Sequence, residues 1–350
     1  MKINKRHLLR ILLLLFVFLV LLCSAIILTV HWIWFKPNVI VSDPENASVY
    51  IRTNSDFEDV KSQLYSQGFI KRRNTFEWLA EKKTYPSQIK AGRYLLFNGM
   101  SNNVLINTLR AGLQTPVQVV MNNIRLKKDL AGKVGRQLEA DSLSILLLLS
   151  DSIFLQKLGF NTENCLTLFI PNTYEFYWNT DATGFINRMY KEYEEFWIPE
   201  RDQKRTRSGM TRQEVSILAS IIEKETRKND EKARMAGVYM NRWRDDWKLQ
   251  ADPTIVYVVG DFTMKRVLNR HTRIDSRYNT YLYEGLPPGP ICVPSIESID
   301  AVLDFEEHDY YYFCAREDFS GYHAFAKTYN QHLINARKYQ RAFRERTNAP

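Results

Sequence analysis

The stretch T-R-Q-E-V-S-I-L-A-S-I-I-E-K-E, residues 211–225, decides how the rest of the chain is interpreted. Thr211 and Glu214 have the spacing of a capping box, in which each side chain accepts a hydrogen bond from the backbone amide of the other residue. A helix is therefore predicted to begin here. Val215 and Leu218 start an apolar stripe at helical spacing, which predicts that one face of this helix is buried in the protein core.

The apolar stripe continues through Ile222 and then ends in a carboxylate, because Glu225 is the next residue on the same face. A carboxyl group on a core-facing stripe is partly desolvated, which disfavours its charged form and raises its pKa. A general acid needs such a pKa near neutral pH, so Glu225 is a candidate catalytic acid. Glu223 lies with Ala219 and Ser220 on a more polar flank and is the weaker candidate. The alternative is that E-K-E is an ordinary solvated helix end.

A long apolar segment near the N-terminus predicts a membrane-spanning helix. Residues 11–30 are uncharged and almost wholly apolar, a length that crosses a hydrocarbon core of about 30 Å. The segment continues into aromatic residues at 31–35, which favours an uncleaved anchor over the alternative, a cleaved signal peptide. Because residues 1–10 are basic, we expect this tail in the cytoplasm and everything after Lys36 outside the inner membrane.

The composition indicates a folded protein without a nucleic-acid partner. A length of 350 residues allows two or three domains, and the apolar share of 45% with a charged share of 25% is typical of a chain with a real core. Lys and Arg exceed Asp and Glu by 48 to 39, yet five of the basic residues flank the N-terminal apolar segment. The rest of the chain has only a slight positive excess, so we expect no nucleic acid to bind.

The cysteines and histidines predict neither a disulfide framework nor a metal site. Cys23 lies in the apolar segment, which leaves Cys165, Cys292 and Cys314. Such a sparse, odd set allows at most one disulfide, and whether Cys292 pairs with Cys314 stays open at this point. No zinc-ligand spacing occurs and the six histidines are scattered, so we expect no metal and no cofactor.

Residues 45–121 are predicted to form a small α+β module. Its predicted elements are a helix begun by a capping box at Ser55–Glu58, a helix at 75–79, a strand at 92–97, a helix from Ser101 to Gly112, and a closing strand at Val117–Met121. The module carries no evident catalytic chemistry and has the size of a binding domain.

The remainder, residues 122–345, is predicted to be a mixed α+β domain around the 211–225 helix. Its predicted elements are helices between 125 and 160, at Gly184–Trp197, Met235–Trp243, Ser295–Leu303 and Tyr329–Arg344, and a hairpin of Tyr310–Ala315 with Gly321–Phe325. Residues 199–209 are predicted to be a charged, exposed loop. The segment Gly285–Pro290 is either a stiff linker or a loop whose backbone approaches a ligand closely.

Several short motifs in the second domain, taken together, resemble one protein family. They are L-A-S-I-I-E-K-E-T at 218–226, V-Y-M-N-R at 238–242, L-Q-A-D-P-T at 249–254, Y-N-T-Y at 278–281, G-L-P-P-G-P-I at 285–291, and Y-F-C with G-Y-H-A-F near the C-terminus. In content, order and spacing they resemble the endolytic murein transglycosylases of the MltG (YceG-like) type. The module at 45–121 resembles the LysM-like subdomain of that family.

The resemblance implies a fold and an activity. The fold is α+β: a transmembrane helix, a small LysM-like module, and a mixed α+β catalytic domain with a central Glu-bearing helix. The activity is lytic cleavage between N-acetylmuramic acid (MurNAc) and N-acetylglucosamine (GlcNAc) in nascent peptidoglycan strands, which leaves 1,6-anhydro-MurNAc ends and terminates glycan elongation. The implied partners are the glycan strands and peptidoglycan synthases (penicillin-binding proteins), with the catalytic domain in the periplasm.

The resemblance also implies site residues. The family's catalytic Glu falls in the E-K-E element and corresponds to Glu225, with Glu223 as the reserve candidate. The polar residues of the matched motifs that we expect to line a substrate groove are Gln250, Asp252, Tyr278, Asn279 and His323. Two alternatives stay open. One is a hydrolytic muramidase, in which Glu175, Asp252 or Glu223 would supply a second carboxylate; the other is a non-enzymatic cell-wall-binding scaffold.

Overall fold

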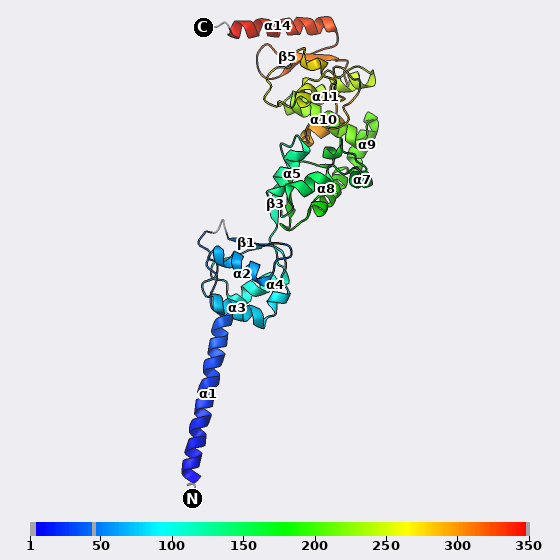
Figure 1. Cartoon of the computed structure of the whole chain (residues 1–350). Coiled ribbons are helices and arrows are strands. Elements are labelled where there is room, and N and C mark those ends of the chain that lie inside the picture. Colours follow the sequence, from blue (N-terminus) through cyan, green and yellow to red (C-terminus); the bar gives the residue numbers. More distant parts are fainter. Residues whose placement is uncertain (1–4, 44–46, 348–350) are drawn as a thin grey trace. The chain divides into compact units, whose positions relative to one another are not determined.

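The computed structural model describes residues 5–43 and 47–347 and divides the chain into two compact units (Figure 1). The first unit contains the described residues up to Val117 together with Glu175–Thr180, and the second contains Gln118–Tyr174 and the described residues from Asp181 onward. The described part of the chain is mostly helical, and its strands pair in two-stranded sheets. The fold is therefore α+β, as predicted.

Helix α1, Lys5–Phe35, is long and apolar enough to cross a membrane. Leucine and other aliphatic side chains cover the helix on all sides and stay exposed over most of its length, which is consistent with a membrane anchor or a signal sequence. At its C-terminal end, Ile33 and Trp34 pack against the core of the first unit. The Trp34 ring meets the edge of the Trp78 ring at 6.2 Å, so this end of α1 is joined to the module.

The module in the first unit is a two-stranded sheet covered by three short helices. Its elements are β1 Ser48–Ile51, α2 Phe57–Ser66, α3 Arg73–Lys82, a 3₁₀ turn Tyr85–Ser87, β2 Gly92–Leu95 and α4 Asn102–Ala111. Strands β1 and β2 are antiparallel, with Ser48 opposite Leu95. The buried side chains of all these elements form one core.

The helix caps of the module were predicted with one error. Ser101 caps α4 and Gly112 ends it with a φ of 72°, as predicted. The capping box of α2, however, consists of Asp56 and Asp59, so the predicted box at Ser55–Glu58 is wrong by one residue. An Asp is as good an N-cap as a Ser, and the pattern alone does not choose between neighbouring acceptors.

The chain passes between the two units three times, and strand β3, Val117–Val120, lies at the first passage. Strand β3 pairs with β4, Thr173–Phe176, whereas β1 and β2 form a sheet of their own. The prediction that Val117–Met121 closes the module is therefore wrong. The Glu175–Thr180 segment belongs to the first unit, where the Trp178 ring packs on Tyr50 at a centroid distance of 5.0 Å.

The second unit is built around helix α10. Its helices are α5 Lys127–Gly135, α6 Ser142–Leu148, α7 Ser152–Lys157, α8 Ala182–Phe196, α9 Pro199–Ser208, α10 Arg212–Glu225, α11 Asn229–Arg244, α12 Asp252–Val259, α13 Ile296–Leu303 and α14 Tyr329–Thr347, with 3₁₀ turns at Cys165–Leu168 and His271–Arg273. Helix α10 packs against α9, α11, α12 and α13. It forms the core of the unit.

Helix α10 begins and is buried as predicted. Thr211 is its N-cap, and Thr211 and Glu214 form the capping box. Val215, Leu218 and Ile222 are fully buried. The preceding segment is different from the prediction: residues 199–208 are a helix, not a loop. Pro at a first helical position and a left-handed Gly at the end, here Gly209, are the usual signals of such a helix, although its polar composition hides them.

The C-terminal part of the second unit is a hairpin covered by a helix. Strands β5, Tyr312–Ala315, and β6, His323–Ala326, are antiparallel as predicted, and α14 packs along them (Figure 1). The His332 ring stacks on Tyr312 with centroids 5.6 Å apart, so it faces the strands. All four cysteines are free, which settles the open question: Cys292 and Cys314 do not pair.

The Pro-rich loop 285–290 is packed tightly against the rest of the second unit. A Cβ atom at Gly289 would lie 2.0 Å from the backbone oxygen of Glu163 and 2.8 Å from the hydroxyl of Tyr278. Gly289 therefore allows the backbone of this loop to lie close to the backbone of Glu163. Gly285, at the other end of the loop, has a φ of 72° and open space around it.

Replacing Gly289 by Ala should lower the free energy of unfolding of the second unit by about 2–3 kcal/mol, because the opposing Glu163 carbonyl is backbone and cannot swing away. Gly285→Ala is the matched control and should cost only about 1 kcal/mol, from backbone strain. Urea unfolding of the full chain in a nonionic detergent, followed by tryptophan fluorescence, measures both. Equal losses in the two variants would contradict the steric argument.

Candidate active site

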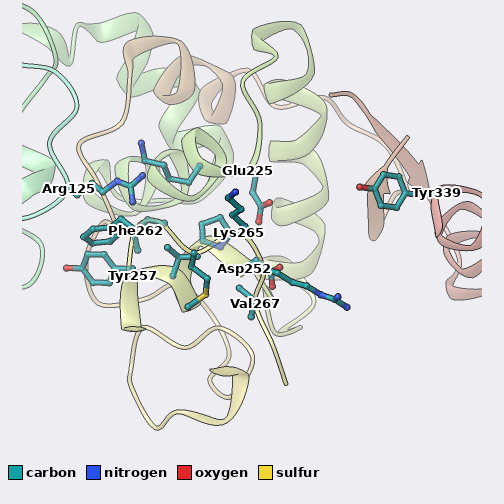
Figure 2. Close-up of a pocket in the computed structure, with 14 residues that line it drawn as sticks. Arg125, Glu225, Asp252, Tyr257, Phe262, Lys265, Val267 and Tyr339 are labelled. Atoms are coloured by element: carbon teal, nitrogen blue, oxygen red, sulfur yellow. The ribbon is translucent and has the colours of Figure 1, made fainter. Parts of the chain in front are cut away.

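Glu225, the last residue of α10, lines a cleft of about 580 Å³ in the second unit (Figure 2). The side chain is partly buried between its own helix and α11. Burial raises the pKa of this carboxyl group to about 7; the nearby Asp252 also raises it, and a hydrogen bond from Tyr239 opposes both. Near neutral pH a large fraction of Glu225 therefore keeps its proton, as a general acid requires.

Tyr239 fixes the orientation of this carboxyl group. It lies on α11, is completely buried, and donates a hydrogen bond from its hydroxyl to Oε1 of Glu225 at 2.7 Å. The edge of Phe313 packs against the Tyr239 ring at 5.9 Å, which holds the ring in place. Among the described residues, Oε2 of Glu225 has no hydrogen-bond partner, so this is the oxygen that can carry an acidic proton into the cleft.

Asp252 is the second carboxylate in the cleft and begins α12. The Tyr281 hydroxyl donates to its Oδ1 at 2.6 Å. The turn before α12 is held by Thr280, whose hydroxyl accepts from the amide of Ala251 at 3.0 Å and lies 2.9 Å from the hydroxyl of Thr254. Figure 2 shows Glu225 and Asp252 near each other. Contacts between the L-Q-A-D-P-T and Y-N-T-Y motifs thus fix the position of the Asp252 carboxylate.

Glu223, two residues before Glu225, has a different environment. Its Oε2 accepts hydrogen bonds from Ser295 at 2.6 Å and from Ser298, and the Lys232 ammonium lies 3.3 Å away. Burial alone would raise the pKa of Glu223, but these donors and the positive charge outweigh it and lower the pKa. Glu223 is therefore ionised at neutral pH and joins α10 to α11 and α13.

The flank of α10 that carries Glu223 is more buried than its sequence predicts. Ala219 and Ser220 are both fully buried there, so the prediction of a polar flank is wrong. The Ser220 hydroxyl donates to the Ile217 carbonyl and accepts from the amide of Ile291, which satisfies it without water. A small hydroxyl can be buried in this way whenever a helix carbonyl is within reach.

His323, at the start of β6, is paired with a buried carboxylate. Its Nδ1 lies 2.7 Å from Oε2 of Glu231, and its backbone amide donates to Oε1 of the same residue at 2.8 Å. Glu231 is only 3% exposed, and burial would raise its pKa, but its bonds to His323 and Thr226 outweigh this and lower it. The His323 ring packs edge-on against Phe313, which also contacts Tyr239.

The other three predicted groove residues lie in different settings. Gln250 is exposed and has a φ of 51°, a left-handed conformation that is uncommon for glutamine. Tyr278 is half-buried and packs on Tyr257, which lines the cleft, at 4.8 Å. Asn279 is fully buried, and its side-chain amide donates to the carbonyls of Thr272 and Ile274. Its contacts are therefore with its own loop.

Four residues that act on the site were not singled out from the sequence: Tyr239, Tyr281, Thr280 and Glu231. The first three stand inside motifs that the sequence analysis quoted, so their positions were visible and only their roles were not. Glu231 gave no signal, because an acid in the first turn of a helix is usually exposed.

The profile of the YceG-like family matches residues 49–338. The chain belongs to this family. It is 27% identical over 313 residues to the endolytic murein transglycosylase of Bacillus subtilis strain 168, covering 83% of this chain and 84% of that protein. It is 26% identical over 299 residues to the protein of the same name from Streptococcus pneumoniae strain D39, covering 77% of this chain and 54% of that protein.

A solved structure agrees with this assignment. The 2.6 Å crystal structure of a YceG-like protein from Listeria monocytogenes matches with a TM-score of 0.55 and 26% sequence identity, over 82% of this chain and 97% of that one. The resemblance to the YceG-like family that the short motifs indicated is confirmed over most of the chain.

Replacing Tyr239 by Phe should raise the pKa of Glu225 above about 7. The Tyr239 hydroxyl stabilises the carboxylate form more than the neutral form, so its loss favours the proton. Infrared titration of the carboxyl C=O band in the full-length protein, with Glu225→Gln subtracted to assign the band, measures this. An unchanged or lower titration midpoint in the Phe variant would show that the bond does not tune this carboxyl group.

The Glu225→Gln variant should depend less on pH for its stability than the original chain. The pKa of Glu225 is raised from 4.5 to about 7 on folding, so the stability that this group contributes is fully present below pH 4.5 and is lost as the pH rises to 7. Glutamine cannot ionise and avoids this loss. Between pH 4.5 and pH 8, the urea midpoint of the original chain should fall relative to the midpoint of Glu225→Gln. An equal change of midpoint in the two proteins would contradict the raised pKa.

Proposed function

We propose that this protein is a membrane-anchored endolytic lytic transglycosylase that cleaves the bond between MurNAc and GlcNAc within peptidoglycan strands. The observation that carries this proposal is Glu225. It stands in the E-K-E element of a YceG-like chain, lines the cleft, and has a pKa raised to about 7 by burial. The relatives named endolytic murein transglycosylases support the reaction class.

In the first step, Glu225 acts as a general acid. The proton on Oε2 passes to the glycosidic oxygen while the bond from that oxygen to C1 of MurNAc breaks, and positive charge develops on C1 and the ring oxygen. Tyr239 remains on Oε1 and stabilises the carboxylate that forms. The Asp252 carboxylate, whose orientation Tyr281 fixes, lines the same cleft and would favour the cationic sugar.

In the second step, the same residue acts as a base. The Glu225 carboxylate takes the proton of the C6 hydroxyl of MurNAc, and the C6 oxygen bonds to C1 to close the 1,6-anhydro ring. No water is consumed, and Glu225 is protonated again at the end. One titratable group therefore serves both steps, and a pKa near the working pH suits both the giving and the taking of a proton.

Hydrolysis is the second candidate, because Asp252 supplies another carboxylate in the same cleft. A hydrolytic glycosidase uses one carboxyl group as the acid and a second as nucleophile or as the base that activates water. In that case Asp252 would take the second role and the product would have a reducing MurNAc end. The two products differ in mass by one water molecule.

The same proposal includes a location. Helix α1 would anchor the chain in the inner membrane with the basic N-terminus in the cytoplasm, so that both units lie outside, beside newly made glycan strands. Cleavage there would end strand elongation. Peptidoglycan synthases, the penicillin-binding proteins, are the partners that we propose, since they produce the strand that this cleft would cut.

The test is digestion of purified peptidoglycan by the full chain in a nonionic detergent, with the products analysed by mass spectrometry. We expect fragments with 1,6-anhydro ends, and a loss of rate of at least about 100-fold in Glu225→Gln, because glutamine cannot transfer a proton. Glu223→Gln is the matched control, two residues away: it should keep most of the activity but unfold more easily, since it leaves the buried Lys232 without its counter-charge.

Each other outcome has a definite meaning. Reducing ends in place of anhydro ends would make the enzyme a muramidase. Loss of cleavage in Glu223→Gln but not in Glu225→Gln would move the acid to Glu223. Failure of the folded original chain to cut any strand would favour a cell-wall-binding scaffold over an enzyme.

A further inference from the structure

The wall of the cleft has a cluster of positive charge. Four basic side chains reach it: Arg125 from the segment before α5, Lys224 from α10, and Lys265 and Arg266 from the segment after α12. They come from three separate parts of the sequence, so the cluster is a product of folding and not of a local run of charge. We call these four residues the cationic wall.

The cationic wall has no counter-charge of its own. In the part of the chain that the structure describes, no carboxylate lies within 4.0 Å of any of the four cationic groups. Elsewhere in this unit, Lys232 is paired with Glu223 and Arg212 with Asp202. The two acids of the cleft do not neutralise the wall: Asp252 accepts from Tyr281, and Glu225 from Tyr239.

The wall extends along the cleft. The Arg125 guanidinium lies over the Phe262 ring at 4.5 Å, whereas Lys265 runs past Glu225 in the view of Figure 2. The aromatic side chains of Phe262 and Tyr257 line the same cleft. A charged ligand is held more strongly at such a partly enclosed site than on an open surface. The arrangement fits a ligand with several negative charges spread over some length.

The glycan backbone offers no such charges, since its sugars present hydroxyl and acetamido groups. Negative charge is found on the substituent of the MurNAc 3-oxygen: a lactyl carboxylate when it is bare, or a stem peptide with several carboxylates attached through the lactyl group. We propose that the cationic wall binds the carboxylates of the stem peptide, so that the enzyme prefers strands that still carry their peptides. This inference rests on the proposed function and names the form of its substrate.

The stem peptide fits better than the bare lactyl group. A lactyl carboxylate is one charge close to the sugar ring, and one or two cations would satisfy it. The cationic wall has four cations from three segments, with Arg125 drawn on the far side of Lys265 from Glu225 in Figure 2. A flexible peptide with separate carboxylates can reach cations at both places while the sugar lies at Glu225.

The test measures binding of the full-length Glu225→Gln protein in detergent to three soluble strand preparations. One carries intact stem peptides, one carries peptides whose carboxylates have been converted to amides, and one has lost its peptides to an amidase and keeps the lactyl carboxylates. We expect the intact strands to bind about tenfold more tightly than either of the others, as charge-assisted hydrogen bonds would give. Added salt should reduce the difference.

Variants of the wall identify the residues responsible. Adding Lys265→Gln and Arg266→Gln to the Glu225→Gln protein should remove most of the preference for intact strands. Both side chains are exposed, so their replacement leaves the core untouched. The matched control is Lys128→Gln with Arg270→Gln, two exposed basic residues near the same segments that do not line the cleft; it should keep the preference.

Equal binding of intact and amidated strands would overturn the inference. Tight binding of the amidase-treated strands would also overturn it and would assign the wall to the lactyl carboxylate. Binding is measured without cleavage, so these outcomes are separate from the proposed reaction: a preference for peptide-bearing strands in a chain that cuts nothing would refute the activity and leave the binding inference standing.

Discussion

The burial of helix α10 is the constraint on which the second unit depends. Every residue from Val215 to Ile222 is buried, so the helix has no solvent face along this length and must be enclosed by its neighbours. The polar groups at its C-terminal end therefore emerge among the neighbouring helices, where they are only partly exposed. Residues two apart on a helix point about 200° away from each other, so Glu223 and Glu225 enter different surroundings.

The surroundings give these two carboxyl groups opposite properties. Both lose hydration, which on its own raises the pKa of each. For Glu223, two serine hydroxyls and the Lys232 ammonium outweigh this loss and lower its pKa, so the group is ionised at neutral pH. Glu225 receives a single hydroxyl, from Tyr239, and has Asp252 nearby, so it stays close to balance between its two forms. The number of donors within reach decides which acid can exchange a proton.

The sequence was most informative where a pattern is local. The cap at Thr211, the stripe that leads to Glu225 and the β5–β6 hairpin all depend on residues a few positions apart, and the structure agrees with them. Prediction failed where the outcome depends on contacts between distant segments: β3 pairs with a strand more than fifty residues later, and Ser220 is buried because Ile291 comes to meet it. Glu231 shows the same limit, since only the fold brings His323 to it.

The charged α9 segment is an instructive exception. Its boundaries are locally encoded by Pro199 and Gly209, yet its polar composition suggested a loop. The helix is stabilised on the side that faces α10 by ion pairs, among them Arg212 with Asp202, and by Arg201 with Asp300 of α13. A helix held by ionic contacts has no strong apolar stripe, which is why a search for hydrophobic periodicity does not detect it.

The Glu175–Thr180 segment has a consequence for how the chain can be divided. Because the first unit includes this short piece, its fold is completed only after residue 180 has been synthesised, although its other described residues end at Val117. A fragment cut at residue 118 would separate the Trp178 ring from Tyr50, leaving one aromatic surface uncovered on each piece. The two units are thus interlaced along the chain, and neither is an uninterrupted stretch of sequence.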